Sequence, residues 1–136
     1  MDNQAQPAIP LILIVDDDWL NRELLEGTLT LAGYAVVSAN SGQRALQLAR
    51  QRQPQVIVLD VNMPDLNGYE VCLQVRATPA TAHIPVIMVS AADQSDEAER
   101  ALAVGADGFL SRVRITQELP QQIERLLAGN ANQPHV

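Results

Sequence analysis

The sequence lacks lysine altogether: its nine basic residues are all arginine, against 16 aspartate and glutamate residues. The resulting formal charge of −7 argues against a protein that binds the phosphate backbone of nucleic acids. One tryptophan, two tyrosines and one phenylalanine are too few aromatic residues for a platform of stacked bases. A single cysteine excludes a disulfide framework and is typical of a reducing compartment.

Long hydrophobic runs are also missing. The first apolar run, Leu11 to Val15, is too short for a signal sequence or a membrane span. It ends at Asp16, and no basic segment precedes it. We therefore expect a cytoplasmic protein that does not enter the membrane.

The sequence does contain enough hydrophobic material for one folded domain. It has 136 residues, of which 47% are hydrophobic and 18% are charged, and these values are typical of a single globular domain. Polar, aperiodic ends predict a flexible tail at residues 1–9 and a flexible tail or the start of a linker at residues 129–136. The domain itself is expected at residues 10–128.

Short apolar runs alternate with amphipathic segments along this domain. The runs are rich in isoleucine and valine, which predicts strands that are buried on both faces. The clearest runs are Leu11–Val15, Val56–Leu59 and Val86–Val89, and weaker ones lie at Tyr34–Ala39 and Gly108–Ser111.

Helical periodicity fills the intervals between these runs. We expect the first helix to follow an N-cap at Asp18, to end at Gly33 and to bury an inward stripe; its members are Leu20, Leu24, Leu25, Thr28 and Leu31. The next three helices are expected at Gly42–Arg52, capped by Ser41, at Gly68–Arg76 and at Ser95–Val104.

The third of these, Ser95–Val104, should bury Ala98, Ala101 and Leu102. A last helix is expected to start near Leu119, because Pro120 is tolerated only in a first helical turn.

This alternation predicts an α/β protein with a doubly wound (βα)5 architecture. A five-stranded parallel sheet would carry helices on both faces, joined by right-handed crossovers. The strand order 2-1-3-4-5 would make the first and third strands neighbours, and the ligand site would lie at the carboxyl ends of the strands.

Chemically active side chains follow the strands at that edge. Asp16 and Asp17 follow the first apolar run, Asp60 follows the third, Ser90 the fourth and Arg112 the fifth. Two carboxylates about 4 Å apart repel by about 4 kcal/mol at an effective dielectric near 20, so the three acids need a counter-charge. Oxygen ligands with open positions suit Mg²⁺.

Magnesium beside a carboxylate nucleophile is the equipment for forming an aspartyl phosphate. Ser90 and Arg112 could then hold phosphoryl oxygens. Each residue also has a structural explanation, because an aspartate or serine after a strand commonly caps a helix or a turn. Their convergence at four strand ends favours a functional site.

The same residues lie in segments that resemble the receiver domain of two-component response regulators, of the chemotaxis-regulator type. The resemblance covers about Pro10 to Ala128, and its longest segment is Val-Ile-Val-Leu-Asp-Val-Asn-Met-Pro-Asp-Leu-Asn-Gly-Tyr-Glu-Val at 56–71. Ile-Leu-Ile-Val-Asp-Asp-Asp at 12–18, Pro-Val-Ile-Met-Val-Ser-Ala at 85–91 and Gly-Ala-Asp-Gly-Phe-Leu at 105–110 support it. It implies a flavodoxin-like fold and a phosphorylation switch rather than an enzyme.

The resemblance implies a role for each site residue. Asp60 matches the phospho-acceptor, and Mg²⁺ would be held by Asp17 and Asp60 directly, by Asp16 through water and by the backbone carbonyl of Asn62. Ser90 matches the hydroxyl that contacts the phosphoryl group. Two further positions are Phe109, which matches the aromatic residue that changes rotamer, and Ala92, which with Asn62 would tune the phosphate lifetime.

The resemblance also implies partners. A sensor histidine kinase or a histidine phosphotransfer protein would supply the phosphoryl group. A downstream protein, an output domain or a second copy in a homodimer would bind the face made by the fourth helix, the fifth strand and the fifth helix. Because few residues follow the fifth helix, we expect a stand-alone receiver or a piece of a longer regulator or hybrid kinase.

One position departs from the family pattern. Arg112 and Val113 stand where the family has Lys-Pro, and an arginine is longer, planar and forked where a lysine is a point charge. The main hypothesis is that phosphorylation persists with Arg112, and the alternative is a pseudo-receiver that binds partners without phosphorylation. A haloacid-dehalogenase-like phosphatase, with Asp16 of an Asp-x-Asp motif as nucleophile, is a weaker alternative because the lysine and the later acidic pair are missing.

Overall fold

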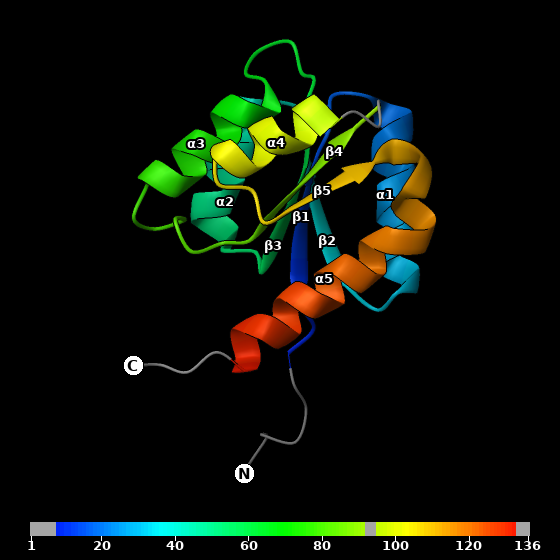
Figure 1. The fold of residues 1–136 in the computed structure, drawn as a ribbon. Coiled ribbons are helices and arrows are strands. Elements are labelled where there is room, and N and C mark those ends of the chain that lie inside the picture. The colour runs from blue at the N-terminus through cyan, green and yellow to red at the C-terminus, as the bar shows by residue number, and fades with distance from the viewer. Residues whose placement is uncertain (1–7, 92–94, 133–136) are drawn as a thin grey trace.

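The computed structural model describes residues 8–91 and 95–132. Strands and α-helices alternate throughout this part of the chain (Figure 1). A short 3-10 turn, η2, lies between the last strand and the last helix. In chain order the elements are β1 (Leu11–Val15), α1 (Trp19–Leu31), β2 (Ala35–Ala39), α2 (Gly42–Arg52), β3 (Val56–Asp60), α3 (Gly68–Ala77), β4 (Val86–Ser90), α4 (Ser95–Ala103), β5 (Gly108–Ser111), η2 (Arg112–Arg114) and α5 (Ile115–Asn132).

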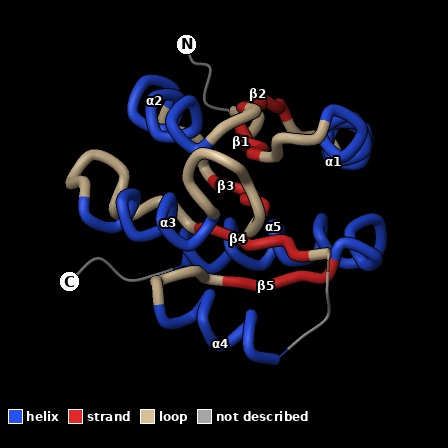
Figure 2. Tube along the Cα trace, turned by 90° about the horizontal axis from the view of Figure 1, so that it is seen from above, coloured by secondary structure: helices blue, strands red, loops and turns tan. Residues whose placement is uncertain are grey.

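The five strands form one parallel sheet in the order β2-β1-β3-β4-β5, which confirms the predicted fold class. Viewed from above, α1 and α5 lie on one face of the sheet, and α2, α3 and α4 lie on the other (Figure 2). The register pairs Val15 with Leu59, Asp60 with Val89, and Ser90 with Ser111. The carboxyl ends of the four neighbouring strands β1, β3, β4 and β5 are therefore level with one another.

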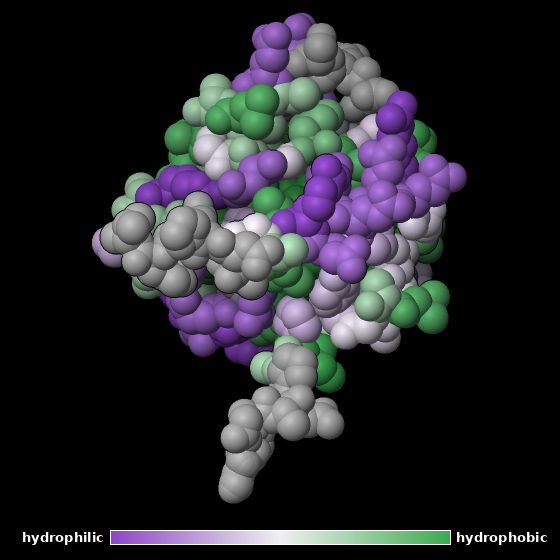
Figure 3. All heavy atoms as spheres, turned by 60° about the horizontal axis from the view of Figure 1, so that its bottom comes forward, coloured by the Kyte–Doolittle hydropathy of each residue, from purple (hydrophilic) through white to green (hydrophobic). Residues whose placement is uncertain are grey.

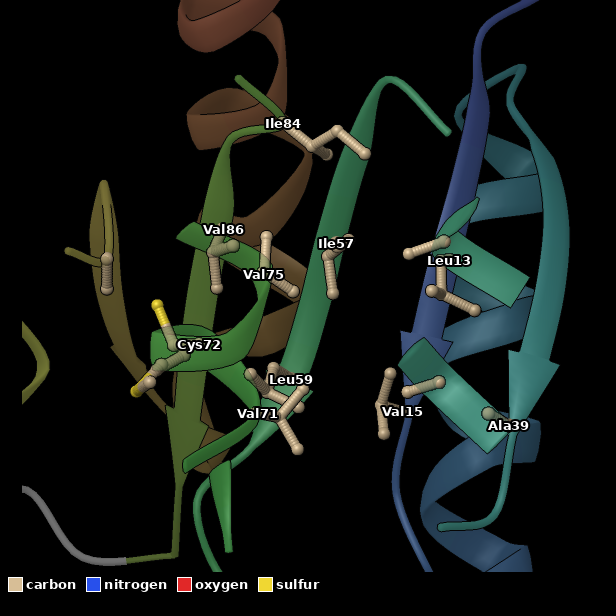
Figure 4. Packing of buried hydrophobic residues seen from close by; sticks show 14 of the residues in the cluster. Leu13, Val15, Ala39, Ile57, Leu59, Val71, Cys72, Val75, Ile84 and Val86 are labelled. Atoms are coloured by element: carbon tan, nitrogen blue, oxygen red, sulfur yellow. The ribbon is translucent and has the colours of Figure 1, made fainter. Parts of the chain in front are cut away.

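Two hydrophobic cores flank the sheet, because successive side chains of a strand point to opposite faces. Leu13 and Val15 of β1 pack on the α2–α4 side, together with Val71 and Cys72 of α3 (Figure 4). On the other side, β1 contributes Ile12 and Ile14 to the core with α1 and α5. Strands buried on both faces explain the continuous apolar runs in the sequence.

The inward stripe of α1 is narrower than predicted, and the prediction was wrong for three leucines. Leu25 and Leu29 are buried, but Leu20, Leu24 and Leu31 are 66%, 45% and 91% exposed. The helix packs one i,i+4 pair, Leu25 and Leu29, against the sheet. The other three leucines lie outside the row in which every fourth residue faces the sheet, so they are on the outer side of the helix. In α4, Ala101 is buried as predicted, whereas Leu102 is 63% exposed for the same reason.

The start of the last helix was also predicted wrongly. The helix α5 begins at Ile115 and carries Pro120 in its interior. Proline removes one backbone donor, but Ile115 and Ile123 on either side of it are buried in the core and hold both halves of the helix in place. The helix also continues past Gly129, where the tail was expected to begin, whereas residues 1–7 and 133–136 of the predicted tails lie outside the described part.

Two predicted helix caps have different outcomes. The Ser41 hydroxyl accepts a hydrogen bond from the Arg44 amide, which confirms the cap of α2. Asp18 lies at the N-cap position of α1, but its side chain makes no capping hydrogen bond. Instead, the Asp18 amide donates to the Asp16 carboxylate at 2.9 Å. The Asp16 carboxylate, just after β1, thus orders the start of α1.

A second cap of α2 comes from the loop after β3. The Asp65 carboxylate accepts hydrogen bonds from the amides of Gly42 at 3.1 Å and Gln43 at 3.2 Å. Although burial acts to raise the pKa of Asp65, hydrogen bonds from the backbone amides of Gly42, Gln43, Leu66 and Asp65 itself outweigh it and hold the pKa below its ordinary value. The contact ties the β3–α3 loop to the helix that follows β2.

The outer surface carries most of the charge. Hydrophilic residues cover much of the face shown in Figure 3, and the hydrophobic residues there form separate areas. Within residues 8–91 and 95–132, no helix combines the length and apolar character that crossing a bilayer requires.

Candidate functional site

Three aspartates meet at the carboxyl edge of the sheet, as the sequence predicted. Asp16 and Asp17 follow β1, and Asp60 is the last residue of the adjacent strand β3. One carboxylate oxygen of each lies within 4.8 Å of those of the other two. Asp16 and Asp60 are buried and Asp17 is exposed, so the cluster opens to solvent on the Asp17 side.

Arg112 supplies the cation for this cluster. It is the first residue after β5, and its guanidinium spans two acids: Nη1 lies 3.1 Å from Asp16 Oδ2, and Nη2 lies 3.1 Å from Asp60 Oδ1. The side chain is 20% exposed. One arginine faces three carboxylates, so the four groups together carry a net charge of about −2 when all are ionised.

The electrostatics of the cluster act most strongly on Asp60. Burial, followed by the nearby charge of Asp16, raises the pKa of Asp60 to about 7. The Arg112 guanidinium and a hydrogen bond from the Asn62 amide oppose the rise in pKa, and Asp17 adds to it. Asp60 is thus a carboxylate whose ionised form is costly unless more positive charge arrives.

Local backbone packing fixes the position of Asp60. A Cβ at Gly68 would lie 2.5 Å from the Asp60 carbonyl oxygen and 2.9 Å from Val61 Cα, so only glycine fits there. The Gly68 amide donates to the Val61 carbonyl at 2.8 Å. Asn67 and Glu70 form a capping box at the start of α3, which anchors the turn after Asp60.

Ser90 ends β4 beside this cluster and is buried. Its hydroxyl is hydrogen-bonded to the carboxylate of Glu97 in α4. Phe109 lies in β5, where it is half-buried and packs against the core on the α2–α4 side. Asn62 is exposed just after Asp60, and Ala92 lies outside the described residues.

Two residues at the site were not found from the sequence. Arg22 of α1 donates from Nη1 to the Asp16 carbonyl at 2.9 Å, and Glu97 is the partner of Ser90. Both lie in the first turns of helices that follow strand ends, which is the one signal that could have indicated them. Their side-chain directions depend on how each helix packs, and no local pattern reports that.

Comparison with known proteins agrees with this geometry. The family model described as response regulator receiver domain matches residues 12–124. The response regulator MprA of Mycobacterium leprae is 40% identical over 116 residues, which are 85% of this chain and 50% of that protein. The chain thus spans about half the length of this curated relative.

Solved structures show the same fold. The chemotaxis protein CheY4 of Vibrio cholerae is 32% identical, with a TM-score of 0.82 over 88% of this chain and 99% of that one. The receiver domain of a sensor histidine kinase from Pseudomonas aeruginosa, described with a magnesium ion in its active site cleft, is 26% identical, with a TM-score of 0.82 over 89% and 99% of the two chains. The sheet order, the acidic cluster and these matches lead to one conclusion: the chain belongs to the family of response regulator receiver domains of two-component signalling.

Proposed function

We propose that this receiver domain accepts a phosphoryl group on Asp60 from a phosphohistidine of a sensor histidine kinase or a histidine phosphotransfer protein. The observation that carries the proposal is the convergence of Asp16, Asp17, Asp60 and Arg112 at one edge of the sheet. In the transfer, an Asp60 oxygen attacks phosphorus, and the bond from phosphorus to the donor imidazole breaks. Arg112 and Ser90 bind the oxygens of the transferred group.

The donor set at the cluster fits Mg²⁺. Its members are oxygens only, supplied by Asp16, Asp17 and Asp60, and the backbone carbonyl of Asn62 would complete the set. A bound Mg²⁺ would neutralise the charge that builds up during transfer. The need for it follows from the charge balance, because a phosphoryl group would bring further negative charge to a cluster that Arg112 only partly neutralises.

Phosphorylation would change the binding surface on α4, β5 and α5. Ser90 would turn toward the phosphoryl oxygens, and Phe109 would move into the room that this opens. A downstream protein, an output domain or a second copy of the chain would then bind the altered face. This is a shift between two populations of one fold.

The surface around the cluster suits a protein donor. Trp19 and Leu20 begin α1 directly after the acidic residues and are exposed, and Val113 next to Arg112 is 81% exposed. A donor that brings a phosphohistidine to Asp60 must cover these apolar side chains, and their burial would stabilise the encounter.

The test is phosphorylation by acetyl phosphate. With MgCl₂ present, we expect the intact mass of the protein to rise by one phosphoryl group, and we expect no increase with EDTA or in Asp60→Asn. Equal labelling of Asp60→Asn would contradict the proposal, as would wild-type protein that takes up nothing.

A phosphorylation-independent interaction module is the second candidate, and one observation favours it. Arg112 is engaged by Asp16 and Asp60, so it supplies from within the chain part of the charge that a metal ion would supply. Comparing beryllofluoride binding by the wild type and by Arg112→Lys separates the two candidates. Mg²⁺-dependent binding by the wild type supports phosphorylation, whereas binding only by Arg112→Lys supports the interaction module.

A further inference from the structure

The Ser90 hydroxyl has a partner on α4. Ser90 Oγ is hydrogen-bonded to Glu97 Oε1, which links the end of β4 to a helix seven residues further along the chain. An ionised carboxylate only accepts hydrogen bonds, so Ser90 is the donor. A serine hydroxyl has one proton to donate. If Ser90 gives that proton to a phosphoryl oxygen, it loses its hydrogen bond to Glu97.

We propose that Glu97 is a positioning residue that competes with the phosphoryl group for the Ser90 proton. This inference rests on the proposed phosphorylation of Asp60. In the unphosphorylated protein Glu97 holds the hydroxyl toward α4, and in the phosphorylated protein Glu97 has lost this hydrogen bond. The two arrangements exclude each other.

Contacts between α3 and α4 hold the backbone at Glu97 in place. The Tyr69 hydroxyl donates to the backbone carbonyl of Glu97 at 3.5 Å, and the Arg100 guanidinium lies 4.1 Å from the centre of the Tyr69 ring. Tyr69 is buried and directly follows Gly68, the glycine that touches the Asp60 backbone. Glu97 and Ala101 are four residues apart on one helix face, and Ala101 is fully buried.

Charge adds to the competition. A phosphoryl group on Asp60 would place negative charge next to Ser90, and Glu97 is the carboxylate that shares this hydroxyl. Like charges at short distance repel, so phosphorylation favours a position of α4 in which Glu97 is further away. By linkage, phosphorylation strengthens the binding of a partner that holds α4 in that position, and the partner strengthens binding of the phosphoryl group by the same factor.

The experiment measures binding of beryllofluoride to the full chain at constant MgCl₂. Amide NMR spectra of ¹⁵N-labelled protein detect the binding. Removing the competitor in Glu97→Ala should tighten binding by roughly three- to tenfold, the range expected for one typical hydrogen bond. Glu97→Gln keeps an acceptor but loses the charge, and should give a smaller gain.

The control variant is Glu99→Ala, which removes the same charge from an exposed position of the same helix and should bind like the wild type. In a Ser90→Ala background, Glu97→Ala should give a clearly smaller gain, because the shared proton is gone and only the relief of charge repulsion remains. An equal gain with and without Ser90, or no gain in Glu97→Ala while the wild type binds, would overturn the competition alone. A wild type that does not bind would overturn the proposed function and the competition together.

Discussion

Arginine–carboxylate pairs lie at both ends of the sheet, and the two ends are balanced differently. At the amino end, Arg76 of α3 pairs with Asp107 at 2.7 Å and also donates to the carbonyls of Ala82, Ile84 and Gly105. The same Asp107 oxygen accepts the Val86 amide at 2.9 Å. One cation meets one anion there, and the remaining donors go to backbone carbonyls.

At the carboxyl end, Arg112 faces three aspartates instead of one. Two of these acids are buried, and the pKa of Asp60 is raised to about 7. The same kind of ion pair thus stabilises the fold at one end and leaves excess negative charge at the other. The difference teaches that the excess of negative charge, rather than the ion pair itself, distinguishes the end of the sheet that carries the candidate site.

The largest loss of stability is expected at the amino end of the sheet, where one cation balances one anion. Arg76→Ala would take the donor from three carbonyls and the cation from Asp107, and we expect the free energy of unfolding to fall by about 3 kcal/mol. Urea denaturation measures this. Arg50→Ala, at an exposed position of α2, is the matched control and should change stability by less than about 0.5 kcal/mol; a similar loss in both variants would refute the role assigned to Arg76.

An Asp→Asn substitution should change the free energy of unfolding in opposite directions at the two ends of the sheet. In EDTA at pH 8, Asp60→Asn should raise the free energy of unfolding by about 1–3 kcal/mol, because it removes an acid whose ionised form is costly in the fold. Asp107→Asn should lower it by about 0.5–1 kcal/mol, because it weakens a pair that is balanced and partly exposed. Two changes of the same sign would break the comparison.

The pH dependence gives the sign of the Asp60 effect independently. The folded-state pKa of about 7 lies above the ordinary value of 3.8, so the favourable contribution of protonated Asp60 is complete below about pH 4. It is lost as the pH rises through 7. The advantage of Asp60→Asn over the wild type should therefore grow from pH 5 to pH 8, as measured by urea denaturation in EDTA; an advantage independent of pH would contradict this origin.

A modest gain in stability is expected from the metal. Mg²⁺ at ten times its dissociation constant should raise the free energy of unfolding by about 1.4 kcal/mol, since it binds the folded state. Thermal unfolding with and without MgCl₂ measures the change. Asp17→Asn should abolish it and Asp107→Asn should keep it, whereas loss of the Mg²⁺ effect in both variants would show that the ion does not act at the acidic cluster.

The fold and the acidic cluster could be predicted because both follow from repeating patterns. Ile-Val runs at the positions of β1, β3 and β4 identify strands buried on both faces, and a parallel sheet brings their carboxyl ends together. Asp16, Asp17 and Asp60 needed nothing more than strand order to be placed side by side. Arg112 was placed near them by the same rule.

What could not be predicted depends on side-chain direction and on burial elsewhere. The exposure of Leu20 and Leu31 follows from the rotation of α1 on the sheet, and Pro120 is tolerated because buried residues on both sides hold the helix. The links from Ser90 to Glu97 and from Arg76 to Asp107 cross between elements. Neither has a spacing that distinguishes it from ordinary surface charge.

The cap that Asp65 provides to α2 bears on the order of folding. The first two amide donors of α2, those of Gly42 and Gln43, are satisfied by a side chain 22 to 23 residues away rather than by a neighbour. Such a contact requires closure of a long loop before it forms. This part of the α2 cap can therefore form only when the loop after β3 has come close to the helix, whereas the Ser41 cap needs residues of its own segment alone.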